Sequence, residues 1–262
     1  MMGFFEGLSE SFSSFFKSIP FTFRHFSFSF VVPVLLFILL FILVSYLGNS
    51  VYDIVSNKFF AYIGIQHDSG WFFSFISFLL RGLLFVLFKL IFFFIFFFFS
   101  GYVILIILSP LLSYLSEKTE KIEKNKDYPF LFNVWIKQIG RSILLSLRNM
   151  FIQLALTLLV LLLSFFPIIG WLISPFAAMI IFIFNAYFFG FSFLDYSFER
   201  KGLTISQSVS IVRKNKGLSV GFGTLFYVFY IIPFIGNFLA PFLAIFLVVA
   251  ATMSAEKIVI NE

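Results

Sequence analysis

The chain has 262 residues, of which 61% are hydrophobic and 11% are charged, and its formal net charge is +6. An ordinary soluble domain is roughly 45–50% apolar and about 25% charged, so this composition indicates an integral membrane protein and excludes most classes of soluble enzyme. The absence of cysteine excludes disulfides and thiolate metal sites. No polar stretch is long enough for a second, soluble domain, so we expect one all-α membrane domain over 1–262.

The first three predicted elements are helices that contact or cross a membrane. Residues 1–19 place apolar side chains at intervals of three and four, which predicts an amphipathic helix in the interface. The apolar run 26–46 has 21 residues, enough to cross the ~30 Å hydrocarbon core. Region 71–115 predicts a second, long spanning helix. Its Arg81 and Lys89 either snorkel to the interface or line a pore.

A charged run over 117–127 is predicted to be solvated. Pro129 then opens a second interfacial helix over 129–148, whose basic face includes Lys137, Arg141 and Arg148. This face suits anionic lipid headgroups. The positive net charge therefore requires no nucleic-acid partner.

The most informative feature is an internal repeat. The pattern P-x-I-G-x-x-x-x-P-F begins at Pro167 and again at Pro233, 66 residues later. Each copy lies between two apolar arms, which predicts helical hairpins over 149–194 and 217–256. The first proline is expected to end a helix, the glycine to let the backbone reverse, and the second proline to open the returning helix. The predicted tips comprise Pro167, Gly170, Ser174 and Pro175 in the first hairpin and Pro233, Gly236, Asn237 and Pro241 in the second.

Length and tip chemistry favour re-entrant, hemi-penetrating hairpins over a protein with six full spans. The arms of the second hairpin have 16 and 14 residues, about 24 and 21 Å, and neither tip carries a charge. Helices that begin at the second prolines would point partial positive charge toward the midplane, which suits an anion. Alternatively, proline and glycine only build the turns. Gly217 and Gly221 form a G-x-x-x-G pattern that lets two helices approach closely.

Basic residues predict the orientation. Lysines and arginines number seven in 117–148 and five in 195–216, but only one in 47–70. Both termini and both basic loops are therefore expected to be cytoplasmic, and a bacterial inner membrane fits. Asp195 and Glu199 lie where the first hairpin returns to this side. They either form structural ion pairs with Arg200 or Arg213, or take part in proton coupling.

Several of these features together resemble a known family. They are the segment Leu194-Asp195-Tyr196-Ser197-Phe198, the basic residues 213–216 before a glycine-rich arm, and the P-x-I-G tips. They are similar to the CysZ-type sulfate transporters of the etoposide-induced membrane protein superfamily, over nearly the whole chain and most strongly over 165–257. The resemblance implies an oligomeric inner-membrane protein with interfacial, spanning and hemi-penetrating helices. It also implies uptake of sulfate for cysteine synthesis.

In that family an Arg-Arg pair after a Pro-Gly turn, at the start of the first spanning helix, helps to bind sulfate. The matching positions are Arg24 and His25, next to Phe23. The glycine is absent and the second arginine is a histidine, which leaves another anion possible. Arg24 would lie just ahead of the spanning helix, where unpaired N–H groups and the helix dipole favour an anion. Alternatively, Arg24 anchors the helix to lipid phosphate and His25 is solvated.

No catalytic constellation is present. His25 and His67 stand alone, and the sequence contains no phosphate loop, H-E-x-x-H or G-x-S-x-G motif. We therefore expect no enzymatic activity, no cofactor and no metal. Two functions stay open. The chain either passes a small oxyanion, sulfate above all, through an oligomeric pathway, or it is a non-transporting scaffold or lipid-organising protein.

Overall fold

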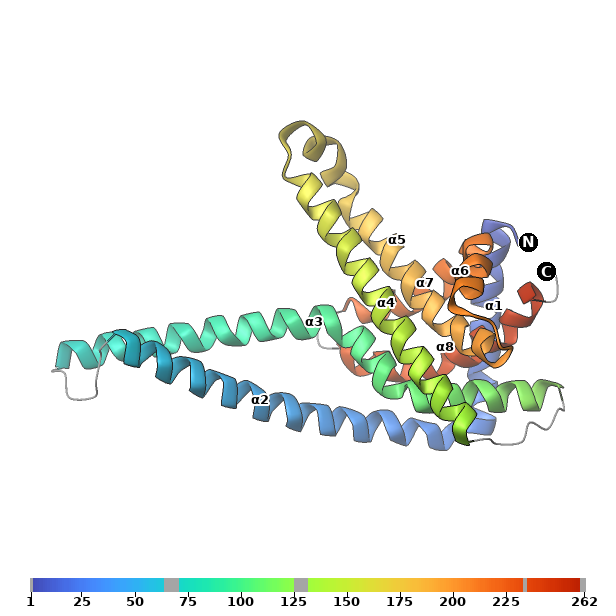
Figure 1. Cartoon of the computed structure of the whole chain (residues 1–262), viewed down its shortest axis with the longest axis horizontal. Coiled ribbons are helices and arrows are strands. Elements are labelled where there is room, and N and C mark those ends of the chain that lie inside the picture. The colour runs from blue at the N-terminus through green and yellow to red at the C-terminus, as the bar shows by residue number, and fades with distance from the viewer. Residues whose placement is uncertain (1, 64–70, 125–131, 233–234, 260–262) are drawn as a thin grey trace. The chain divides into compact units, whose positions relative to one another are not determined.

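A computed structural model of the chain describes residues 2–63, 71–124, 132–232 and 235–259 (Figure 1). All regular secondary structure in these ranges is helical, as the composition and periodicity predicted. The elements are α1 (Phe4–Phe26), the 3-10 turn η1 (Ser27–Phe30), α2 (Val31–Ile63), α3 (Trp71–Lys124), α4 (Phe132–Ser164), α5 (Pro167–Arg200), α6 (Ile205–Lys214), α7 (Lys216–Tyr230) and α8 (Ile235–Val259). Pro129 and Pro233 fall outside the described residues, as does the side chain of Asn237.

Five helical stretches among the described residues are long and apolar enough to cross a membrane. They are Phe4–Leu36, Tyr102–Glu123, Ile139–Ser164, Gly170–Arg200 and Phe238–Ile258. A stretch of about 20 apolar residues is what a bilayer requires of a spanning helix. The chain is therefore an all-helical, multi-pass membrane protein.

The chain divides into two compact units. One comprises residues 34–100, which hold most of α2 and the first part of α3. Inside this unit the ring of Tyr52 packs edge-on against Phe85, with centroids 5.3 Å apart, and a Cβ on Gly48 would lie 4.0 Å from Nζ of Lys89. These two contacts show that α2 and the first part of α3 run antiparallel, because residue numbers fall along one helix as they rise along the other. The ammonium group of Lys89 also lies over the Phe85 ring, 5.3 Å from its centroid.

The other unit comprises residues 1–33 and 101–262, and α5 runs through its centre. α5 packs against α4, α7 and α8, and α1 packs against α7 and α8. α5 and α7 approach so closely that a Cβ on Gly190 would collide with the carbonyl oxygen of Ser219, and one on Gly223 with that of Ala186. Backbone contact of this kind is how membrane helices pack without large side chains between them.

α1 is longer than predicted, since it continues through Pro20 to Phe26. Small residues every three or four positions form the stripe that is buried against protein: Gly7, Ser11, Ser14, Ser18 and Thr22. Phe5, Phe16 and Phe23 point outward and are more than half exposed. A Cβ on Gly217 would collide with the Phe4 carbonyl and one on Gly221 with Ser11. The close approach predicted from the G-x-x-x-G pattern is therefore confirmed, with α1 as the partner.

The first hairpin differs from its prediction in where its helices begin and end. α4 is one continuous helix of 33 residues, with no break between the predicted interfacial helix and the predicted arm. Pro167 is the first residue of the returning helix α5, and Pro175 lies inside it. The prediction that Gly170 lets the backbone reverse is also wrong, because Gly170 lies inside α5. A Cβ there would collide with the carbonyl oxygen of Ser164, the last residue of α4, so this glycine permits contact between the two helix ends.

The second hairpin repeats this geometry. A Cβ on Gly236 would collide with the carbonyl oxygen of Tyr230, the last residue of α7. α8 begins at Ile235, so Pro241 lies inside a helix of 25 residues. The prediction of a 14-residue returning arm is therefore wrong. In this hairpin only the 15-residue α7, about 22 Å long, is shorter than the ~30 Å hydrocarbon core.

The charged run after the second predicted span also differs from expectation. α3 continues through it to Lys124, and Thr119 and Glu120 of the run are buried, as is Ser116 just before it. The hydroxyls of Ser116 and Thr252 are hydrogen-bonded at 2.7 Å, which joins α3 to α8. This part of the run therefore belongs to the protein interior rather than to solvent.

Candidate functional site

The end of α5 and the start of α6 are joined by a turn whose conformation follows from a C-terminal and an N-terminal helix-capping motif. Gly202 adopts φ +73°, and the N–H groups of Gly202 and Leu203 donate to the carbonyls of Glu199 and Phe198, which closes a Schellman motif. Thr204 then caps α6, with reciprocal bonds to Gln207. The turn therefore presents the Leu203 carbonyl in a fixed position.

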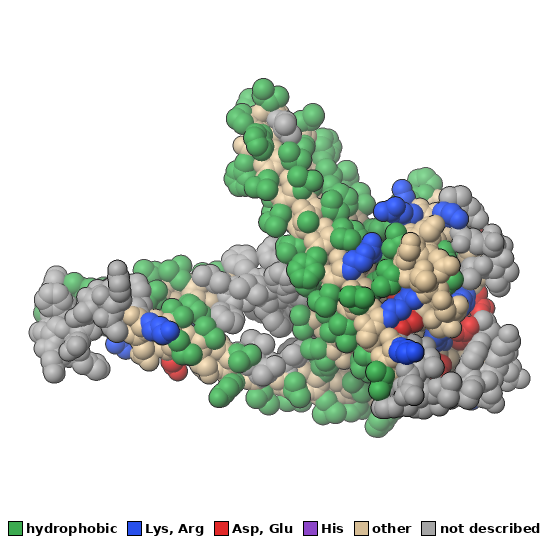
Figure 2. All heavy atoms as spheres, viewed as in Figure 1, with side chains coloured by type: hydrophobic (Ala, Val, Ile, Leu, Met, Phe, Trp, Pro, Cys, Tyr) green, Lys and Arg blue, Asp and Glu red, His purple; other side chains and the backbone are tan. Residues whose placement is uncertain are grey.

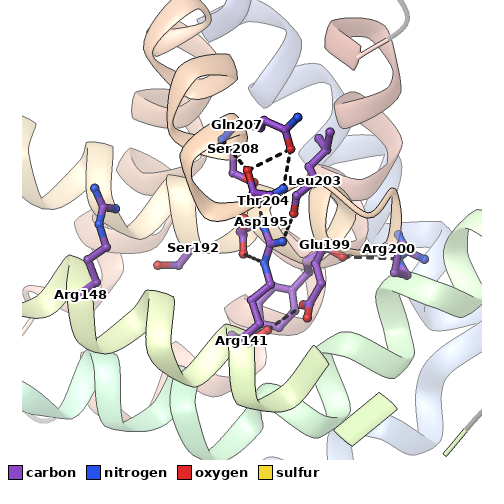
Figure 3. A network of polar contacts seen from close by, with 12 residues as sticks. Arg141, Arg148, Ser192, Asp195, Glu199, Arg200, Leu203, Thr204, Gln207 and Ser208 are labelled. Carbon is purple, nitrogen blue, oxygen red and sulfur yellow. Dashed lines mark hydrogen bonds and ion pairs between the residues drawn. The ribbon is translucent and has the colours of Figure 1, made fainter. Parts of the chain in front are cut away.

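Arg141 of α4 joins three elements at this turn (Figure 3). Its Nη2 donates to Oδ1 of Asp195 at 2.9 Å and to Oγ of Ser208 at 2.9 Å. Its Nη1 donates to the Leu203 carbonyl. The side chains of Arg141 and Asp195 are 17% and 2% exposed. A guanidinium whose donors are occupied in this way is a structural ion, not a free anion site.

A hydrogen bond to a second carboxyl group and one further ion pair lie beside the Arg141–Asp195 pair. Oγ of Ser142 donates to Oε2 of Glu199 at 3.2 Å, and Arg200 forms an ion pair with Glu120 of α3, also at 3.2 Å. The two side chains of the second pair are 8% and 7% exposed. Charges this deeply buried persist only when they are paired, so α3, α4, α5 and α6 are locked together here.

Neutral polar pairs continue along the same helix contact. Nδ2 of Asn149 donates to Oγ of Ser192 at 3.2 Å, and Nε2 of Gln153 donates to Oδ1 of Asn185. The hydroxyl of Tyr102 donates to Oε1 of Gln153, which ties α3 to the row.

We call these contacts the polar seam. It consists of the pairs Arg141–Asp195, Ser142–Glu199, Asn149–Ser192 and Gln153–Asn185. The α5 members 185, 192 and 199 are seven residues apart, the spacing that keeps one helix face against an antiparallel partner. The seam therefore leads from the charged turn into a hairpin whose outer surface is apolar.

Arg24, His25 and Phe23 lie together in the last turn of α1, and η1 and α2 follow at Ser27 and Val31. The prediction that Arg24 lies just ahead of the start of the spanning helix is wrong, because the helix end at Arg24 leaves carbonyls rather than N–H groups unpaired. Both polar side chains are exposed. Nδ1 of His25 lies 3.0 Å from the Phe21 carbonyl. In the described part of the chain Arg24 has no ion-pair partner.

The other predicted site residues lie in different environments. Asp195 and Glu199 are buried in the seam, but the arginine that pairs with Asp195 is Arg141 and not Arg213. Arg213 is exposed on α6, and Ser174 is exposed on α5. Arg141 was expected on a lipid-facing basic surface, and this expectation is wrong. The available signal was the spacing of seven residues between Ser142 and Asn149, which matches the spacing of Asn185, Ser192 and Glu199 on α5.

Comparison with known proteins gives one result. The sequence model of the family described as "Sulfate transporter CysZ/Etoposide-induced protein 2.4" matches residues 8–241. No individual curated protein matches the chain. The matched range includes most of α1, the polar seam and both hairpin turns.

Proposed function

Because this chain belongs to the sulfate transporter CysZ/etoposide-induced protein 2.4 family, we propose that it is a transporter or channel for a small oxyanion, with sulfate as the first candidate. The family includes sulfate transporters. Uptake of sulfate would supply cysteine synthesis. No step of this activity requires a cofactor or enzymatic chemistry.

The observation that carries the proposal is the polar seam inside an apolar hairpin. Polar side chains within membrane helices are costly and usually mark the path of a solute or ion. The Arg141–Asp195 ion pair and the Ser142–Glu199 hydrogen bond at the base hold α4 and α5 in register. Above them, the side-chain amides of Asn149 and Gln153 each donate one of their two N–H groups across the seam, and the second N–H of each is a donor without fixed charge. Such groups can replace part of an oxyanion's hydration shell and still release it.

We place the first binding step at Arg24. Its exposed guanidinium has no acidic partner in the described residues, whereas the donors of Arg141 are already occupied. His25 and Phe23 flank it. An exposed arginine near the membrane surface attracts an oxyanion through a fork of donors.

The hairpins are proposed to enter the membrane from one side without crossing it. Both helices of the first hairpin contain stretches long enough to cross, Ile139–Ser164 and Gly170–Arg200. If the membrane surface lies at Phe151 and Ile183, beyond the charged base, the hairpin extends 14 residues along α4 and 17 along α5, about 21 and 26 Å, less than the ~30 Å core. Each hairpin also begins with a basic residue followed by a buried asparagine, Arg148-Asn149 and Lys214-Asn215, 18 residues before its first tip proline. This equivalence supports entry from one basic, cytoplasmic side.

Four further features complete the proposal. They are interfacial placement of 1–19, a single membrane domain, a bacterial inner membrane and a homo-oligomer whose protomers share the pathway. The tip residues Pro167, Gly170, Ser174, Pro175, Pro233, Gly236, Asn237 and Pro241 would border that pathway.

Labelled-sulfate uptake into proteoliposomes tests the function. We expect the wild type to exceed empty vesicles, Arg24→Gln to lose about tenfold in uptake at limiting sulfate, and Lys17→Gln, an exposed cation on the same helix, to retain it. Flux no faster than empty vesicles would end the transport proposal. It would favour the alternative, a scaffold or lipid-organising protein, for which the exposed phenylalanines of α1 supply the membrane contact.

A further inference from the structure

Arg148 and Arg213 are two cations that the polar seam does not use. Arg148 lies two turns beyond Arg141 on α4, and Arg213 lies in the last turn of α6. Nη1 of Arg148 donates to Oδ1 of its neighbour Asn149 at 3.3 Å. Neither arginine has an acidic partner among the described residues. In Figure 3 Arg148 points away from the Arg141–Asp195 pair.

The fold brings these two arginines to one tyrosine. α4 and α6 meet where Arg141 donates to Ser208, and Arg148 and Arg213 follow seven and five residues further along their helices. Tyr187 of α5 lies between the two helix positions. Its carbonyl accepts a hydrogen bond of 2.7 Å from Ser219 of α7, six residues after Arg213, and Ser192, five residues after Tyr187, accepts from Asn149, the neighbour of Arg148. Two positive charges and the half-buried phenol therefore lie in one region at the base of the first hairpin, within electrostatic range of one another.

This place borders the apolar surface of the first hairpin. Beyond Arg148, α4 exposes Phe151, and beyond Tyr187 toward the tip α5 exposes Ile183. Figure 2 shows Lys and Arg side chains near the base of the hairpin and hydrophobic ones over the rest of it. In membrane proteins arginine and tyrosine concentrate at this boundary, where the apolar surface meets the headgroups.

We propose that Arg148, Tyr187 and Arg213 bind the phosphate of an anionic phospholipid. All three side chains can donate hydrogen bonds to a tetrahedral oxyanion, and two guanidinium groups match its charge. Free sulfate or phosphate offers the same chemistry to these donors. The lipid is the occupant because the adjoining apolar wall, which includes Phe151 and Ile183, would contact its acyl chains.

The test measures lipid binding by the full-length protein in detergent, using native mass spectrometry and titration. The probes are dioleoylphosphatidylglycerol and dioleoylphosphatidylcholine. One positive charge near an anionic headgroup contributes about fivefold in affinity, so Arg148→Gln with Arg213→Gln should weaken phosphatidylglycerol binding about 25-fold. Tyr187→Phe should weaken it about threefold. The matched control, Lys17→Gln with Lys58→Gln, removes two exposed cations elsewhere and should leave it unchanged.

Three results would overturn the proposal. They are equal binding of the two lipids by the wild type, full retention of phosphatidylglycerol by the double arginine variant, or an equal loss in the lysine control. Millimolar inorganic sulfate that binds through both arginines while the lipid does not would also overturn it, in favour of a free-ion site. If the double variant does not fold, Arg213→Gln alone, at an exposed helix end, must still lose about fivefold. Sulfate flux does not enter the readout, so this test is independent of the transport proposal.

Discussion

The guanidinium of Arg141 reaches α5, the turn after it, and α6 with three separate hydrogen bonds. Its main partner, Asp195, is almost completely buried. Loss of either member would leave the other charge desolvated without compensation, which costs more than the intact pair gains. The pair therefore fixes the register of α4 against α5 at the base of the first hairpin.

We expect Arg141→Gln to lower the free energy of unfolding by about 2–3 kcal/mol, because it leaves the Asp195 carboxylate buried and unpaired. The double variant with Asp195→Asn should cost less than the sum of the single changes, with a coupling of about 1–2 kcal/mol. Denaturant unfolding in detergent, followed by circular dichroism, measures both values. Lys137→Gln, an exposed cation on the same helix, should change stability by less than about 0.5 kcal/mol. Strict additivity would show that the pair is not coupled.

Sequence alone identified Asp195 and Glu199 as members of structural ion pairs or of a proton-coupling site, but it did not identify Arg141 as the partner of Asp195. The amphipathic pattern of 129–148 shows that Arg141 shares a helix with other basic residues. It does not show whether that face meets lipid headgroups or another helix, since both environments accept arginine. Only the packing of α4 on α5 distinguishes Arg141 from the exposed Lys137.

At the scale of elements, glycines decide which helices touch. Gly190 of α5 and Gly223 of α7 each lie against a carbonyl oxygen of the facing helix. We expect Gly190→Ala and Gly223→Ala to separate this pair and to lower stability by more than about 2 kcal/mol, an overpacking cost. Gly140→Ala is the same change on α4, where a Cβ would meet nothing within 4 Å. It should stabilise the helix by up to about 1 kcal/mol. Thermal unfolding of the three variants in detergent measures whether stability falls at positions 190 and 223 and rises at position 140. Equal effects at all three positions would contradict this packing.

The helices were predictable from sequence where nearby residues determine the backbone conformation. Long apolar runs gave helices, and the paired P-x-I-G patterns gave two hairpin turns of the same geometry. Helix ends were less predictable, because Pro167 is compatible with ending one helix or beginning the next, and Pro175 is tolerated inside a membrane helix. The helix that packs against α1 was not predicted either. The small residues of α1 pack against Gly217 and Gly221 of α7, a contact that periodicity within α1 cannot reveal.

At the scale of the whole molecule, the two hairpins are copies of one unit. Gly170 and Gly236, 66 residues apart, make the equivalent contact with the last residue of the preceding helix. Each copy of the repeat starts after a basic residue and returns to the same side of the membrane. This symmetry is compatible with tips that stop inside the bilayer and with tips that emerge on the far side. The uncharged tips favour the first alternative, because a loop in water has no reason to be apolar.

Cysteine accessibility distinguishes these alternatives, and the chain has no native cysteine to remove. We expect Trp171→Cys and Asn237→Cys to resist a membrane-impermeant maleimide applied to intact cells. Lys201→Cys, in the turn after α5, should react only after the cytoplasmic side is opened. Labelling of both tips in intact cells would mean that the hairpins cross fully, and the proposal of re-entrant hairpins would be abandoned. Labelling of Lys201→Cys from outside would reverse the orientation, because the basic loops would then face away from the cytoplasm.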